Sequence, residues 1–158
     1  MILHEKLFCA TIELGIGLVF HLFQRRLFMG ILLILHSIVR WLIVVLGVVA
    51  LVKFTLGLAQ KSAFGKMDRG LSAGFSGLMD LQVTLGLLYF LITGFGGMGF
   101  SPYRTEHAVT MFIAAGVAHA PSMFKKAANK YAVALGAVVG ALALVYIGVA
   151  RLPGGWSR

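Results

Sequence analysis

The stretch LFMGILLILHSIVRWLIVVLGVVAL, residues 27–51, is apolar throughout except for His36, Ser37 and Arg40. A helix needs about 20 apolar residues to cross the ~30 Å hydrocarbon core of a bilayer. This stretch is long enough, so it predicts a transmembrane helix. The same helix would carry an imidazole and a guanidinium one turn apart within the membrane.

The composition of the whole chain agrees with a membrane protein. Of its 158 residues, 59% are hydrophobic and 12% are charged, and the mean hydropathy is +0.94. A soluble domain contains about 25% charged residues. The polar connections between the apolar runs are short, so we expect one membrane domain and no soluble domain.

Four apolar runs are separated by helix breakers, namely Gly65, the segment GFGGMGFSP at residues 94–102, and Pro121. The runs predict an all-α integral membrane four-helix bundle. The predicted spans are residues 32–54, 71–93, 104–120 and 131–150.

The net charge of +9 is concentrated between the apolar runs. Basic loops beside transmembrane helices are typical of the cytoplasmic side of a membrane, where they contact anionic lipid. We therefore expect a lipid bilayer and no nucleic acid as partner, with loops 59–69 and 122–130 in the cytoplasm. The basic residues of these loops are Lys61, Lys66, Arg69, Lys125, Lys126 and Lys130.

The N-terminal segment 1–28 is apolar from Leu7 to Phe23, but Gln24-Arg25-Arg26 leaves little room for a turn before the next run. It is an extra helix, an interfacial helix, or upstream sequence with the true start at Met29. It lacks the charge order and cleavage site of a signal peptide. We divide the chain into this segment and a four-helix domain at 29–158, and assign the segment no function.

Seven polar residues within or at the ends of the predicted spans are candidates for a site. An ionisable group at membrane depth costs ~2.5–3.5 kcal/mol on insertion scales, so such residues mark sites or pair with one another. They are His36, Arg40, Asp80, Gln82, Glu106, His107 and His119.

His36 and His107 are predicted to lie at the same depth, ~6 Å below the outer boundary, since both their helices run inward. Two imidazoles at one depth in a helix bundle can ligate a single haem iron axially. Arg40, one turn below His36, would meet a haem propionate or Glu106. Alternatively, each histidine simply hydrogen-bonds a neighbouring helix.

His119 follows His107 by ~18 Å along the same helix, so it cannot serve the same haem. We expect it near the inner boundary, at a quinone or a lipid headgroup. Asp80, close to Gln82, is interpreted as a proton-relay group, a quinone partner or a partner of Arg40. The pair with Arg40 is the favoured interpretation.

Four motifs resemble a family of small bacterial four-helix membrane proteins that are labelled cytochrome b-like. They are LHSIVRW at 35–41, MDLQVTLGLLYF at 79–90, RTEH at 104–107 and AHAPSMFKKA at 118–127. The resemblance covers about residues 31–156. It implies a multi-pass protein of the bacterial inner membrane.

By this resemblance, His36 and His107 fall on recurrent histidines of the family and would bind haem b. Asp80 departs from the pattern, because some relatives carry a histidine before the LQ pair.

Three functions remain open. The first is an electron-transfer subunit of an oxidoreductase, with one haem between His36 and His107 and Arg40 offsetting propionate charge. The second is a cofactor-free accessory subunit of a larger respiratory or photosynthetic membrane complex. The third is a transporter or proton channel that uses Asp80 and His119. No nucleotide motif is present and Cys9 is the single cysteine, so we expect no substrate-oxidising centre within the chain.

Overall fold

The computed structural model describes the backbone of residues 2–157 and the side chains of residues 23–156. This part of the chain is helical and contains no strand. The long helices are α1 (Ile2–Ala59), α2 (Lys66–Thr93), α3 (Pro102–Ala118) and α5 (Lys130–Ala150). The short elements are a π-helical turn η1 (Gly94–Met98), α4 (Ala120–Met123) and a 3-10 turn η2 (Gly155–Ser157).

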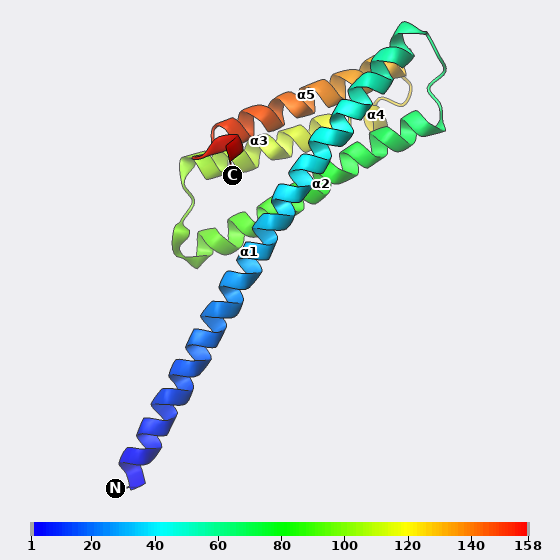
Figure 1. The fold of residues 1–158 in the computed structure, drawn as a ribbon. Helices are drawn as coiled ribbons and strands as arrows, with labels where there is room; N and C mark the ends of the chain where they lie inside the picture. Colours follow the sequence, from blue (N-terminus) through cyan, green and yellow to red (C-terminus); the bar gives the residue numbers. More distant parts are fainter. Residues whose placement is uncertain (1, 158) are drawn as a thin grey trace.

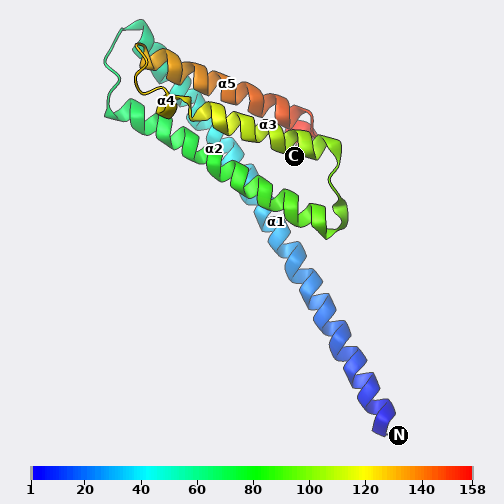
Figure 2. The same ribbon diagram turned by 180° about the vertical axis from the view of Figure 1, so that it is seen from behind.

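The four long helices pack side by side, as Figures 1 and 2 show from opposite sides. Each packs mainly on two neighbours: α1 on α2 and α5, and α3 on α2 and α5. Helices α1 and α3 therefore occupy opposite corners of the arrangement. Side chains from these two helices can meet only across its interior.

The core is built from a few large side chains and many alanines. The largest fully buried side chains are Phe54, Phe75, Ile43, Met79 and Val138. Alanines of α3 and α5 are buried in this core, and their small side chains let helix backbones approach closely. These buried alanines include Ala114, Ala118, Ala134 and Ala141.

The outer faces of the long helices are also apolar. Ile34, Val45, Ile113 and Val139 are each at least half exposed on the chain. Three helical segments are long and apolar enough to cross a membrane: Phe23–Ala59, Lys66–Met98 and Lys130–Ala150. These segments contain three of the four predicted spans and indicate membrane association.

The remaining predicted span corresponds to α3, which is shorter than the others. It has 17 residues and extends about 26 Å at 1.5 Å per residue. The helix ends at Ala118, before Pro121, and α4 starts immediately after His119. Helix α3 alone is therefore too short to span the hydrocarbon core, as the apolar run 104–120 had been expected to do.

Helix α1 runs without interruption through Gln24, Arg25 and Met29 (Figure 1). No turn separates segment 1–28 from the apolar run that follows it, because glutamine and arginine favour helix and no breaker intervenes. The N-terminal part of α1 projects beyond the other helices. The side chains of residues 1–22 lie outside the described ones, and the division at residue 28 stays a prediction.

The two basic connections lie at one end of the packed helices, and the connection between α2 and α3 lies at the other (Figure 1). At that other end, Gly97 and Gly99 have φ angles of 107° and 67°, which side chains with a Cβ rarely adopt. Arg104 closes the connection by donating to Gly99 O (2.7 Å) and to Thr93 Oγ1. The common location of the basic loops agrees with the prediction that they share one side.

Candidate functional site: a histidine pair between α1 and α3

The structure brings the two predicted histidines together. The ring centres of His36 on α1 and His107 on α3 are 6.5 Å apart, and the ring planes are inclined by 70°. Because α1 and α3 occupy opposite corners, this contact crosses the interior of the four packed helices. Both imidazoles are largely enclosed by the chain.

His107 has a defined tautomer. Its Nδ1 lies 2.9 Å from the carbonyl oxygen of Gly148 on α5. A carbonyl can only accept, so Nδ1 carries the proton and donates, which leaves a lone pair on Nε2. A hydrogen bond from one ring nitrogen to a backbone carbonyl is the usual orientation of a metal-binding imidazole.

His36 is held by Gln82 of α2, whose buried side-chain amide lies 3.1 Å from His36 Nε2. With the amide nitrogen donating, the His36 proton is on Nδ1. Turning the amide over would instead make Nε2 the donor and leave the lone pair on Nδ1. Neither His36 Nδ1 nor Gln82 Oε1 has a hydrogen-bond partner among the side chains and backbone described, although both atoms are buried.

A glycine on each of the other two helices makes room for the histidines. A Cβ atom at Gly86 of α2 would lie 2.8 Å from His36 Cε1. A Cβ atom at Gly148 of α5 would lie 2.5 Å from Met111 Cε and 3.5 Å from His107 Nδ1. Any larger residue at either position would displace the imidazole or the methionine beside it.

Not every glycine of α2 and α5 lies against a neighbouring helix. At Gly70, Gly77 and Gly136 an added Cβ would meet nothing within 4 Å among the described residues. The location of Gly86 could have been predicted from the sequence, because it lies one helical turn after Gln82 and therefore on the same face of α2.

Arg40 lies one turn from His36 and packs against two indole rings. Its guanidinium carbon is 5.7 Å from the ring centre of Trp41 and 5.4 Å from that of Trp156. It also donates to Ser37 Oγ (3.3 Å). Trp156 lies in η2 and stacks on Tyr146. Sequence reasoning missed it, because it follows the last apolar run.

One interpretation of the sequence paired Glu106 with Arg40, but the structure pairs it with another residue. Its Oε2 lies 3.0 Å from a guanidinium nitrogen of Arg151, just beyond the end of α5. Both side chains are more than half exposed. The pair joins the start of α3 to the end of α5, which run antiparallel.

The predicted pair between Asp80 and Arg40 is wrong. Both carboxylate oxygens of Asp80 lie close to His119 Nε2, at 2.9 and 3.0 Å. This contact joins α2 to the end of α3, away from the His36–His107 pair. Both side chains are substantially exposed. Of the four residues predicted as further buried polar groups, Gln82 alone is enclosed by the chain.

A second buried polar cluster lies at the basic end and was not anticipated. Asp68 of α2 is 4% exposed. Its Oδ2 accepts from the backbone N–H of Gly65 (2.8 Å) and from the hydroxyl of Tyr131 on α5 (2.9 Å). Its Oδ1 lies 3.6 Å from Lys53 Nζ of α1. Asp68 therefore ties three helices together. Residues 66–69 were interpreted from sequence only as part of a basic loop.

Comparisons with protein-family models, with curated proteins and with solved structures found no match to this chain. The function is therefore inferred from the geometry of the histidine pair and its surroundings.

Proposed function

We propose that this chain is a membrane-embedded, b-type cytochrome-like electron-transfer subunit that holds one haem between His36 and His107. The observation that carries the proposal is the pair of imidazoles from opposite helices, with ring centres 6.5 Å apart. Two imidazoles that share a metal ion at ~2 Å from each nitrogen have ring centres about 6 Å apart.

The surroundings of the pair support this assignment. Gly148 O would keep the Nε2 lone pair of His107 available by accepting from Nδ1. Buried atoms of His36 and Gln82 lack hydrogen-bond partners in the described chain, and such atoms are rare unless they serve a ligand or a strained site. Gly86 and Gly148 allow the His36 ring and the Met111 side chain to lie directly against the backbones of α2 and α5.

The roles of the residues follow from this arrangement. His36 and His107 would hold the iron, and Gln82 would orient the His36 ring. Arg40 would offset the negative charge of a propionate. Haem would supply a one-electron iron couple. We propose a quinone and a partner protein as the electron donor and acceptor.

We further propose a four-helix bundle in the bacterial inner membrane, with loops 59–69 and 122–130 in the cytoplasm. The apolar outer faces of the helices and the gathering of basic residues at one end support this placement. Helix α3 would complete its crossing together with α4. Other membrane subunits are the expected protein partners.

A second candidate is a cofactor-free accessory subunit of a larger membrane complex. The observation that favours it is that each histidine already bonds a neighbouring helix: His36 joins α1 to α2 and His107 joins α3 to α5. In this function the pair would stabilise packing. Replacing either histidine would then lower the stability of the chain and would not change its absorption spectrum.

The first test is the absorption spectrum of the full chain, expressed with ample haem and purified in detergent. We expect a Soret band and a reduced α-band in the wild type and in the control His119→Ala. Both bands should be lost in His36→Ala and in His107→Ala, because each removes one of the two imidazoles that would hold the iron. A folded wild type with no Soret band would refute the haem proposal. A lower thermal midpoint of His36→Ala would then support the accessory subunit.

The space beside His36 provides a second test. Gly86→Ala should lower the haem content of purified protein several-fold, because the new Cβ would lie 2.8 Å from the imidazole. Gly77→Ala on the same helix is the matched control, since its Cβ would meet nothing within 4 Å in the described chain. Haem content is measured from the ratio of Soret to protein absorbance. Equal haem content in both variants would show that Gly86 does not shape the site.

A further inference from the structure

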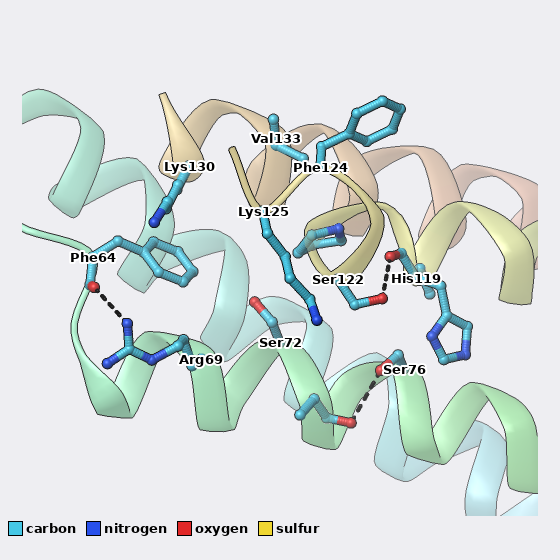
Figure 3. Close-up of a pocket in the computed structure, with 13 residues that line it drawn as sticks. Phe64, Arg69, Ser72, Ser76, His119, Ser122, Phe124, Lys125, Lys130 and Val133 are labelled. Carbon is cyan, nitrogen blue, oxygen red and sulfur yellow. Dashed lines mark hydrogen bonds between the residues drawn. The ribbon is translucent and has the colours of Figure 1, made fainter. Parts of the chain in front are cut away.

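A pocket of about 560 Å³ lies at the basic end of the molecule, and neither His36 nor His107 lines it (Figure 3). It is formed between α2, the end of α3, α4 and the start of α5. Its lining combines cations, hydroxyl groups and apolar side chains. The polar members used below are Arg69, Lys125, Lys130 and Ser72.

The charge of the pocket is positive and uncompensated. Its lining includes Arg69, Lys125 and Lys130 but no aspartate or glutamate. None of the ion pairs found within residues 23–156 involves these three residues. Two carboxylates lie beside the lining, and both have partners already: Asp68 is bound by Lys53, Tyr131 and a backbone N–H, and Asp80 pairs with the lining residue His119. The three cations would therefore gain from a bound anion.

The α2 wall of the pocket offers a hydroxyl donor. Ser72 Oγ is buried and has no hydrogen-bond partner among the described residues. By contrast, the hydroxyls of Ser76 and Ser122 donate to the carbonyl oxygens of Ala73 and His119. Lys125 extends from the connection before α5 toward α2 (Figure 3). A hydroxyl and an amine thus face the same space.

The remaining walls are apolar and continue into the outer surface. Phe64, Phe124 and Val133 line the pocket, and Phe124 is 59% exposed. A free inorganic ion would not use these walls, whereas the glycerol and acyl carbons of a lipid would pack on them. The combination of a cationic interior and an apolar exit matches a phospholipid at the membrane surface.

We propose that this pocket binds the phosphate group of an anionic phospholipid. Arg69, Lys125 and Lys130 pair with the phosphate, and Ser72 donates a hydrogen bond to one of its oxygens. The lipid chains leave along Phe124 toward the apolar faces of the helices. The site is independent of the haem proposal, because it shares no residue with the histidine pair.

The test is native mass spectrometry of the full chain in detergent, titrated with phosphatidylglycerol and with phosphatidylcholine of the same acyl chains. We expect wild type to bind phosphatidylglycerol about tenfold more tightly. The Lys125→Gln/Lys130→Gln variant should lose about twenty-fivefold in affinity for phosphatidylglycerol, at roughly fivefold per lysine. The matched control Lys66→Gln/Lys126→Gln removes two cations from the same end but none from the pocket, and should lose at most about twofold.

Ser72→Ala provides an uncharged variant, which should weaken the binding of both lipids by a similar factor, because the hydroxyl donates to the phosphate group that both headgroups carry. Circular dichroism and gel filtration confirm that each variant is folded. Equal losses in the pocket and control variants would overturn the proposal, since attraction to the basic end as a whole would explain them. Displacement of the lipid by millimolar inorganic phosphate would also overturn it and identify free phosphate as the ligand.

Discussion

Replacing Asp68 by alanine should lower the free energy of unfolding by about 3 kcal/mol. The substitution removes a buried carboxylate and so leaves the groups that bind it unpaired. The carboxylate accepts from the backbone of Gly65 and from the hydroxyl of Tyr131, and it faces Lys53. Lys53 is 38% exposed and can recover water, which keeps the loss at the lower end of the range. The measurement is unfolding of the purified chain in mixed micelles, followed by circular dichroism.

Asp80→Ala is the matched control for this experiment. Asp80 lies on the same helix and also pairs with another helix, but its side chain is 53% exposed and that of His119 is 39% exposed. Pairs of this kind contribute at most about 1 kcal/mol. If both variants lost a similar free energy of unfolding, the burial of Asp68 would not be what makes its contribution to stability large. Asp68→Asn should fall between them, because its amide oxygen can still accept from Gly65.

The second large effect is expected at Gly57 of α1. A Cβ atom at this position would overlap the ring of Tyr131. The ring cannot turn away, because its hydroxyl is bonded to Asp68 and the ring packs edge-to-face with that of Phe64, with ring centres 5.0 Å apart. Gly57→Ala should therefore destabilise the chain by about 1–3 kcal/mol, the usual cost of overpacking a core.

Gly136→Ala on α5 separates this clash from the general effect of adding a methyl group to a helix. No heavy atom among the described residues lies within 4 Å of the new Cβ, and alanine favours helix over glycine by about 1 kcal/mol. We expect the unfolding midpoint of this variant to stay the same or rise. If Gly57→Ala were equally harmless, the packing between α1 and Tyr131 would be looser than the structure has it.

The helices were predictable from sequence because each is encoded locally. The apolar run 131–150 corresponds to α5 at Lys130–Ala150, and the run 71–93 lies within α2 at Lys66–Thr93. The depth argument for His36 and His107 also used local information, since position along a helix follows from residue number at ~1.5 Å per residue. Their contact across the packed helices agrees with that argument.

The partners of the polar residues were less predictable. Depth alone allowed Arg40 to meet Asp80 or Glu106, but these acidic residues pair with His119 and Arg151. The rotation of each helix about its axis, and the order in which helices neighbour one another, decide between such partners. Both are set by packing of buried residues such as Phe54 and Met79, which no local pattern specifies.

The sequence by itself determined that the chain is helical and apolar enough to enter a membrane, because length and composition decide both. It also determined which end gathers basic charge. Only the tertiary structure decided that Gly86 and Gly148 border the histidine pair, that Trp156 covers Arg40, and that Asp68 ties α1, α2 and α5 together. These contacts join residues distant in sequence, and their existence depends on how the faces of separate helices fit together.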